Sequence, residues 1–366
     1  MLKRTRTGRA VIGVMMAGLM LGACSSSKSS DTTVAAEATD SAAGTDAASG
    51  SDTVAATDAA SVETTAAASA ETTAAAPAAS GAGIKLAVNP WTGSAVNANV
   101  AKAALESMGT PVELVDIDEN ATWVGLDAGD LDAVLEVWPS GHAKDYDTYI
   151  TGKKSVVDIG KLGPEARIGW YVPQFVLDEN PSLATWEGFK DSALAKKFAT
   201  AESGDLGQFL MGDPSYVSYD DQIIKNLKLP LKYIVAGSEA ALITAINQAE
   251  TDKKPILLQF WQPHWLQSKV KLARVALPEP TAACAASAAA KDGKYACDYP
   301  VDALFKAASA KLEAKNAMAF TFLKKFQLTT DQQNEIAAMI DSDKVAADVA
   351  AKTWVEAHPD VVKGWM

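Results

Sequence analysis

The fold is indicated most clearly by one stretch, Pro255-Ile256-Leu257-Leu258-Gln259-Phe260-Trp261-Gln262-Pro263-His264-Trp265. Its first part is a continuous apolar run, which predicts a strand buried on both faces of a sheet. A turn that carries Trp261, His264 and Trp265 follows this strand. Ligands of open α/β sheets bind beyond the carboxyl ends of the strands, so we expect Trp261 to face a ligand cleft. The alternative is that both indoles are ordinary core residues.

Strand-like and helix-like patterns alternate over most of the remaining chain. Predicted strands lie at 84–88, 112–117, 133–137 and 167–172, and predicted helices at about 94–108, 120–127 and 238–250. This alternation is typical of an α/β fold with a parallel, doubly wound sheet. From residue 301 to the end the pattern is helical, beginning with a predicted helix at 305–315.

Several tryptophans share one place in this pattern, because each occurs where a predicted strand gives way to a loop. They are Trp91, Trp138, Trp170 and Trp261. Such positions lie at one edge of a parallel sheet, so these indoles can converge. Converging indole faces suit a cation without N–H donors, and each face contributes about 0.5–2 kcal/mol. Three or four faces would support micromolar binding. For Trp170, a site position and a core position both remain open.

The N-terminal part of the chain is expected to lie outside the folded region. Residues 1–23 combine basic residues with an apolar run too short to span a bilayer permanently, which predicts an export signal. They run into the sequence LGAC at 21–24, which resembles the lipobox of bacterial lipoproteins. This resemblance implies that a lipidated Cys24 anchors the protein to the outer face of the cell membrane. Residues 24–82 are almost entirely Ala, Thr, Ser, Asp and Glu, and predict a disordered tether.

Net charge argues against one class of partner. The 366-residue chain has a formal charge of −12; the tether carries −7 and the signal +4, which leaves −9 on residues 83–366. An acidic surface disfavours nucleic acid as a partner.

The inventory of reactive residues argues against catalysis. The sequence contains no Gly-x-Ser-x-Gly elbow, no phosphate loop and no His-x-x-x-His or Cys-x-x-Cys spacing. We therefore expect no catalytic residue, no metal and no cofactor. Apart from Cys24, the cysteines are Cys284 and Cys297, which favours a disulfide in an exported protein. A redox or metal role for this pair is the alternative.

Five motifs, in order, resemble the substrate-binding proteins of bacterial ABC importers for glycine betaine, proline betaine and choline. They are Pro90-Trp91-Thr92-Gly93, Trp123 followed by Gly129-Asp130-Leu131-Asp132, Glu136-Val137-Trp138-Pro139, Gly237-Ser238-Glu239-Ala240-Ala241 and Trp261-Gln262-Pro263-His264-Trp265. The resemblance implies a type II periplasmic-binding-protein-like fold, with lobe 1 at 83–170 plus 278–366, lobe 2 at 171–277 and a hinge between them. It also implies a monomeric extracytoplasmic receptor that serves separate permease and ATPase chains.

The same resemblance implies which residues bind the ligand. Trp138 and Trp261 match the aromatic cage of the family by motif, and Trp91 matches its choline-binding branch. In the family the other lobe often supplies an aromatic from a loop like Asn-Pro-Gly-Trp; here that loop resembles Asp213-Pro214-Ser215-Tyr216, so Tyr216 would take the role. His264 is expected either to bond a backbone carbonyl or to donate to a betaine carboxylate.

The expected function is therefore capture of a quaternary ammonium compound in an aromatic cage. Glycine betaine is the expected ligand, with choline or proline betaine as alternatives. An alternative of another class is a structural surface lipoprotein without uptake of a small ligand. That class explains the anchor and tether equally well, but gives no reason for indoles at successive strand ends.

Overall fold

The computed structural model describes residues 82–366. The predicted export signal, Cys24 and nearly all of the predicted tether lie outside these residues. In the described part of the chain, none of the helices combines the length and the apolar character needed to cross a membrane.

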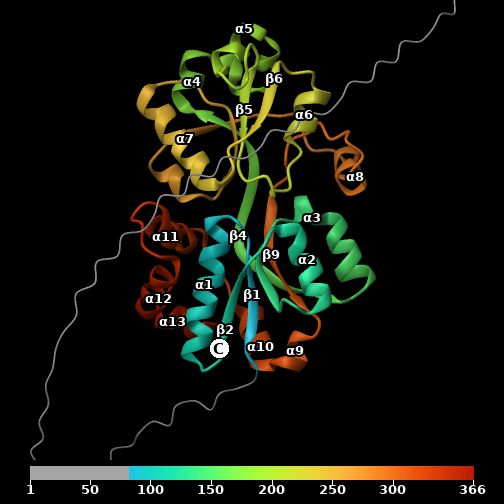
Figure 1. The fold of residues 1–366 in the computed structure, drawn as a ribbon, viewed down its shortest axis with the longest axis vertical. Coiled ribbons are helices and arrows are strands. Elements are labelled where there is room, and N and C mark those ends of the chain that lie inside the picture. Colours follow the sequence, from blue (N-terminus) through green and yellow to red (C-terminus); the bar gives the residue numbers. More distant parts are fainter. Residues whose placement is uncertain (1–81) are drawn as a thin grey trace, which may run out of the picture. The chain divides into compact units, whose positions relative to one another are not determined.

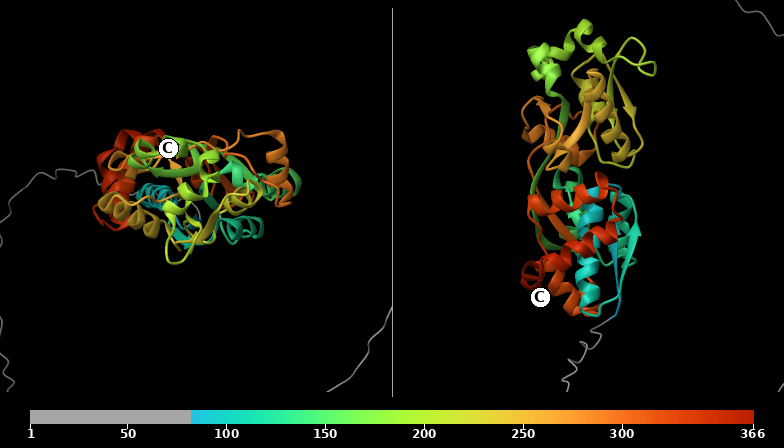
Figure 2. Two further views of the ribbon diagram at one scale, coloured as in Figure 1. Left: turned by 90° about the horizontal axis from the view of Figure 1, so that it is seen from above. Right: turned by 90° about the vertical axis from the view of Figure 1, so that its left-hand side faces the viewer.

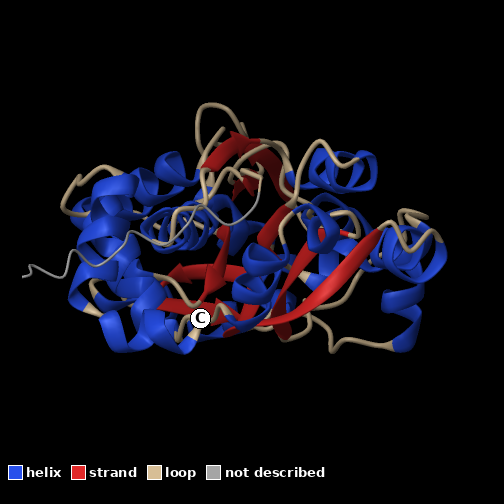
Figure 3. Cartoon of the chain, turned by 90° about the horizontal axis from the view of Figure 1, so that it is seen from below, coloured by secondary structure: helices blue, strands red, loops and turns tan. Residues whose placement is uncertain are grey.

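The described residues form a mixed sheet with helices on both sides of it (Figure 3). The strands are β1 Ile84–Val88, β2 Val112–Asp116, β3 Ala133–Val137, β4 Val156–Pro173, β5 Gly207–Met211, β6 Leu231–Val235, β7 Leu258–Gln262, β8 Leu272–Val275 and β9 Asp302–Ser309. The α-helices are α1 Thr92–Ser107, α2 Glu119–Ala128, α3 Pro139–Asp145, α4 Gln174–Glu179, α5 Ser192–Ala195, α6 Asp220–Asn226, α7 Glu239–Asp252, α8 Ala282–Ala290, α9 Leu312–Lys315, α10 Ala317–Lys325, α11 Thr330–Asp341, α12 Ala347–Ala357 and α13 Pro359–Gly364. A π-helical segment covers Tyr146–Gly152, and short 3₁₀ segments cover Pro181–Ala184, Trp186–Lys190, Lys196–Phe198 and Trp265–Ser268.

The long strand β4 joins two groups of strands (Figure 1). Strand order is β2-β1-β3-β9-β4-β7-β5-β6, with β8 also paired to β4. We call β1, β2, β3 and β9 the first half-sheet, and β5, β6, β7 and β8 the second half-sheet. The early part of β4 pairs with β9, and its later part pairs with β7 and β8. Figure 2 gives the two further views of this arrangement.

Parallel pairing holds at the centre of each half-sheet, and antiparallel pairing joins them. In the first half-sheet β1 is parallel to β2 and β3, and in the second β5 is parallel to β6 and β7. β4 and β9 run antiparallel to each other. Trp91 and Trp138 follow the carboxyl ends of β1 and β3, and Trp261 lies near the carboxyl end of β7. Because β7 runs antiparallel to β3, the carboxyl ends of the two half-sheets face each other, and this brings the tryptophans together.

Burial on both faces explains why β3 is apolar at every position except Glu136. Ala133 and Leu135 pack in the core cluster that includes α1, while Val134 and Val137 pack in a separate cluster with Trp123 of α2. Helices cover both faces of the strand, so apolar residues are favoured on both.

The predicted helix at 305–315 is wrong, because this region contains β9. Every residue from Leu304 to Ser309 is buried, so the strand has no polar face to show a period of two. Ala and Lys favour helix locally, but pairing with both β3 and β4 overrides that preference. The later helices, α10 to α13, follow the helical pattern as expected.

Cys284 and Cys297 are joined by a disulfide across 13 residues of sequence. Both cysteines are buried beside Tyr295 and Tyr299, in the core cluster that also holds Trp170 of β4. This segment, which contains α8, therefore packs against the second half-sheet. The predicted lobe boundaries stay a prediction.

Replacing both cysteines, Cys284→Ser with Cys297→Ser, should lower the free energy of unfolding by about 3 kcal/mol, because the closed loop no longer restricts the unfolded chain. Urea denaturation measures this change. A reductant should destabilise the wild type by a similar amount and leave the double variant unchanged. Equal free energies of unfolding for the two proteins would contradict the prediction.

Candidate functional site

An aromatic pocket lies where the two half-sheets meet. Trp91 directly precedes α1, Trp138 directly precedes α3, Trp261 lies near the end of β7, and Tyr216 belongs to the loop between β5 and α6. The pocket has a volume of about 460 Å³, including space open to solvent. Its wall consists of Trp91, Glu119, Trp138, Gly141, Ile168, Tyr216, Val217, Gln259 and Trp261. The structure therefore brings four of the predicted ligand-binding residues together.

Tyr216 is the aromatic residue that the second half-sheet contributes through its loop. Its ring centroid lies 5.8 Å from that of Trp91 and 5.9 Å from that of Trp261, with interplanar angles of 78° and 86°. These are edge-to-face contacts, the arrangement that aromatic quadrupoles favour. The Tyr216 hydroxyl donates to the carbonyl of Pro90 at 2.9 Å, which connects this loop to the chain that follows β1.

One buried carboxylate orients two of the indoles. Oε1 of Glu136 accepts Nε1–H of Trp91 at 2.7 Å and Nε1–H of Trp138 at 3.0 Å. Oε2 accepts the side-chain amides of Asn97 at 2.8 Å and Gln333 at 3.3 Å. Because both indole N–H groups point at the same oxygen, the two rings are fixed relative to each other.

Glu136 also brings negative charge close to the aromatic wall. Burial raises the pKa of Glu136 to about 7, although hydrogen bonds from Trp91 and Trp138 oppose that change and the nearby charge of Glu239 adds to it. Near neutral pH the carboxyl therefore titrates. Its ionised form is favoured by a cation in the pocket, because opposite charges stabilise each other.

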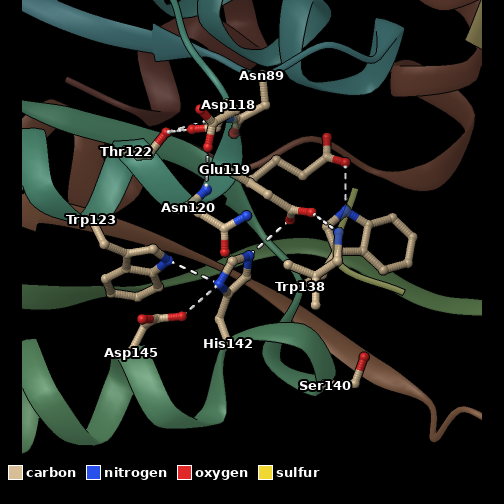
Figure 4. Close-up of polar contacts among 12 residues, drawn as sticks. Asn89, Asp118, Glu119, Asn120, Thr122, Trp123, Trp138, Ser140, His142 and Asp145 are labelled. Atoms are coloured by element: carbon tan, nitrogen blue, oxygen red, sulfur yellow. Dashed lines mark hydrogen bonds and ion pairs between the residues drawn. The ribbon is translucent and has the colours of Figure 1, made fainter. Parts of the chain in front are cut away.

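A second carboxylate, Glu119, forms part of the pocket wall itself. One of its oxygens accepts the backbone N–H of Val217, and the other lies 2.8 Å from Nε2 of His142. Nδ1 of His142 lies 3.0 Å from Nε1 of Trp123 and 3.1 Å from Oδ2 of Asp145 (Figure 4). Burial alone would lower the pKa of His142, but hydrogen bonds and charges from Asp145 and Glu119 raise it to about 9.

No sequence pattern indicated that Glu119 and His142 would lie at the pocket. Glu119 follows Asp118, which caps α2 by accepting the N–H groups of Asn120 and Ala121. An acid in the first turn of a helix is a common complement to the helix dipole, so Glu119 has an ordinary local explanation. Its place in the pocket depends on contacts with residues distant in sequence.

Trp170 does not line the pocket. It is fully buried in the core of the second half-sheet, where its ring centroid lies 4.6 Å from that of Phe209. Its Nε1–H donates to Oδ1 of Asp220 at 2.7 Å. β4 continues to Pro173, so Trp170 lies inside the strand and not at its end. Of the two alternatives for Trp170, a site position and a core position, the structure shows the core position.

His264 also lies outside the wall of the aromatic pocket. Its Nδ1 accepts the backbone N–H of Leu266 at 3.1 Å, so Nε2 carries the proton and donates to Glu239 at 2.9 Å. The expected bond to a backbone carbonyl is not formed, because His264 bonds the carboxylate of Glu239 and the backbone N–H of Leu266. Its expected role toward a betaine carboxylate stays a prediction.

A second cluster could hold a metal ion, because the ligand-type atoms of its three side chains all lie within 4.8 Å of one another. The cluster consists of Glu239, His264 and Asp341. Hydrogen bonds occupy those atoms. Glu239 accepts the N–H of Thr92 at 2.6 Å, and Asp341 accepts the Thr92 hydroxyl at 3.0 Å and Nε1–H of Trp265 at 2.7 Å. This network connects the start of α1 and the end of α11 to the second half-sheet, and it is satisfied without an ion.

The fold and the aromatic pocket between the two half-sheets define this chain as a small-ligand binding protein. A model of the substrate-binding domain of ABC-type glycine betaine transport systems matches residues 82–357, and the chain belongs to this family. It is thus a substrate-binding protein of a betaine/choline-type ABC transporter. Proteins of this family are extracytoplasmic receptors that serve a membrane permease, and they are not enzymes.

Known proteins similar to this chain include a receptor from Pelagibacter ubique (strain HTCC1062), its "Trimethylamine N-oxide-binding protein". It is 29% identical over 285 residues, which cover 76% of this chain and 88% of that protein. Lactococcal OpuAC, closed and complexed with glycine betaine, has a TM-score of 0.61 at 21% identity and covers 78% of this chain and 99% of its own. An ABC-transporter choline-binding protein in complex with choline has a TM-score of 0.61 at 17% identity and covers 77% and 90%. These likenesses establish the type II periplasmic-binding-protein fold.

Binding of a permanently charged cation such as tetramethylammonium should weaken as the pH falls from 8 to 6. Glu136 takes up a proton as the pH passes below its pKa of about 7, and the neutral form no longer attracts the cation. If the cation binds only when Glu136 is ionised, its binding should be about tenfold weaker at pH 6 than at pH 8. Calorimetric titration at each pH measures the affinity.

The matched control is Glu136→Gln, which keeps an oxygen for the indole N–H groups but does not titrate. Its affinity should be lower than that of the wild type at pH 8 and constant between pH 6 and pH 8. A wild-type affinity that does not change over this range would contradict the role of Glu136.

Proposed function

We propose that this protein captures a small compound with a methylated quaternary nitrogen, such as a trimethylammonium compound, in the aromatic pocket and delivers it to a membrane permease. The observation that carries the proposal is the convergence of Trp91, Trp138, Tyr216 and Trp261 on one pocket. A trimethylammonium group has no N–H donors, so it loses little hydrogen bonding when it leaves water for a wall of aromatic faces.

The electrostatics of the pocket support a positively charged group. Glu119 lies in the wall and Glu136 lies directly behind two of the indoles. In the described part of the chain, the wall contains no Lys, Arg or His side chain. Cation–π attraction and the two carboxylates therefore act in the same direction.

Glycine betaine, choline, proline betaine and trimethylamine N-oxide all carry methylated nitrogen and are candidate ligands. The name of the Pelagibacter relative supports the last of these. Two of the structures similar in fold hold glycine betaine and choline. The N–H of His264, one donor expected for a betaine carboxylate, points at Glu239.

Ligand binding is proposed to hold the two half-sheets together. Tyr216 and Val217 lie on one loop of the second half-sheet and hydrogen-bond to Pro90 and Glu119 beside the first. A ligand between the indoles and Tyr216 contacts both sides, so it stabilises the closed arrangement. This proposal retains the predicted lobes, with lobe 1 at 83–170 plus 278–366 and lobe 2 at 171–277. It also retains the prediction that the receptor is a monomer.

The proposed place of action is the outer face of the cell membrane, with Cys24 as the lipidated anchor. Cys24 lies outside the described residues, so this part of the proposal rests on the signal-like sequence of residues 1–23. ABC permease and ATPase chains are the proposed partners, as the family membership supports.

Replacing Trp138 or Trp261 by Ala should weaken binding of trimethylammonium compounds at least about tenfold, because each substitution removes an aromatic face and its desolvated contact. Isothermal calorimetry with choline, glycine betaine, trimethylamine N-oxide and an unrelated amino acid measures the affinities. Trp138→Ala also removes a donor to the buried Glu136 carboxylate, so it should melt at a lower temperature than the ligand-free wild type, and affinities are compared at a temperature where both variants are folded.

Trp170→Phe is the matched control, because Trp170 is buried outside the pocket and donates to Asp220. This variant should lose stability but keep the wild-type affinity. The proposal is wrong if none of the trimethylammonium compounds produces heat with the wild type, or if the Ala variants bind as tightly as Trp170→Phe.

A further inference from the structure

We propose that Glu119 sets the specificity of the pocket, so that it takes a net positive trimethylammonium compound with a hydroxyl group in preference to the zwitterion glycine betaine. A choline-type amino alcohol is the ligand class that fits this description. The inference rests on the proposed function of the same pocket, and it assigns a role to a side chain outside the aromatic cage.

The Glu119 side chain can face the ligand because Asp118, and not Glu119, caps helix α2. Asp118 accepts the first N–H groups of α2, which leaves the Glu119 carboxylate unused by the helix. The side chain is 11% exposed, and it shares the pocket wall with Trp91 and Trp138. A carboxylate thus lies beside the indoles that receive the methylated cation.

The groups around Glu119 donate hydrogen bonds to its carboxylate, so the carboxylate acts as an acceptor. One oxygen accepts the N–H of Val217, and His142 approaches the other through Nε2. A neutral His142 accepts Nε1–H of Trp123 at Nδ1, and a charged His142 donates from Nδ1 to Asp145. In both states Nε2 carries a proton and donates to Glu119. Figure 4 shows Glu119 and His142 pointing toward each other, with Trp123 and Asp145 at the other side of the ring.

The group formed by Glu119, His142 and Asp145 keeps a negative net charge whether the His142 imidazole is neutral or protonated. With His142 protonated, the two carboxylates Glu119 and Asp145 outweigh the single positive charge. The pocket wall has no basic side chain within residues 82–366, and Glu136 lies nearby. A betaine carboxylate would therefore face like charge without a positive partner, whereas a choline-type cation brings no second charge.

A second observation favours a ligand that donates a hydrogen bond. Gln259 lines the pocket, and its buried Oε1 has no hydrogen-bond partner among the described residues. A hydroxyl group on the ligand can donate to this oxygen or to Glu119. A carboxylate cannot donate to either, so it would leave the Gln259 oxygen unsatisfied.

Calorimetric titration of the wild type with choline, glycine betaine and tetramethylammonium tests the proposal directly. Choline should bind at least about tenfold more tightly than glycine betaine. Glu119→Gln should reduce that ratio about tenfold, mainly by weakening choline, since glutamine keeps an oxygen for Val217 but has no charge. Glu119→Asp, which retains the charge, should keep choline as the preferred ligand.

Glu113→Gln is the charge-matched control, because Glu113 is an exposed residue of β2 whose partner is Lys85. It should leave the ratio of the two affinities unchanged. Equal wild-type affinities for choline and glycine betaine, or an unchanged ratio in a folded Glu119→Gln variant, would overturn the role of Glu119 while tetramethylammonium binding still supports the cage. Failure of these three compounds and of trimethylamine N-oxide to bind would instead overturn the proposed function.

Discussion

The pocket depends on the hydrogen bonds that the buried Glu136 carboxylate accepts from two indoles. Removing a carboxylate from water is costly, and here four N–H donors compensate for the loss. They belong to Trp91, Asn97, Trp138 and Gln333. Trp91 and Trp138 follow the carboxyl ends of β1 and β3, and Asn97 and Gln333 belong to α1 and α11. One carboxylate therefore connects the loops and helices around the first half-sheet. The same bonds fix how the indole rings face the pocket.

Contacts between the half-sheets are concentrated around this pocket. Tyr216 bonds the Pro90 carbonyl, Val217 bonds Glu119, and Glu239 accepts the N–H of Thr92. All of them join loops or helix starts at the rim, where the chain can move more easily than inside a sheet. The side chains that complete the pocket also hold its two sides together, which supports the proposed link between closure and ligand capture.

Strand composition explains how far the fold was predictable. β3 and β7 were expected because apolar runs bounded by turns can be recognised without tertiary information. β9 was not, since a strand rich in Ala and buried along its length has no alternating pattern. The antiparallel strands β4 and β9, which make the sheet mixed, pair residues far apart in sequence. Such pairing is specified by packing and not by local preference.

The sequence by itself determined that Trp91, Trp138 and Trp261 lie at or just beyond the carboxyl ends of strands, because apolar runs bounded by turns can be recognised locally. The tertiary structure made these ends meet, because β7 runs antiparallel to β3 and the carboxyl ends of the two half-sheets face each other. Only the tertiary structure decided which other residues join them. Trp170 lies within β4 and packs in the core, and His264 is held by Glu239. Glu119 enters the pocket wall through contacts with Val217 and His142. Charge and hydrogen-bond geometry depend on neighbours brought together by folding, and no local pattern records them.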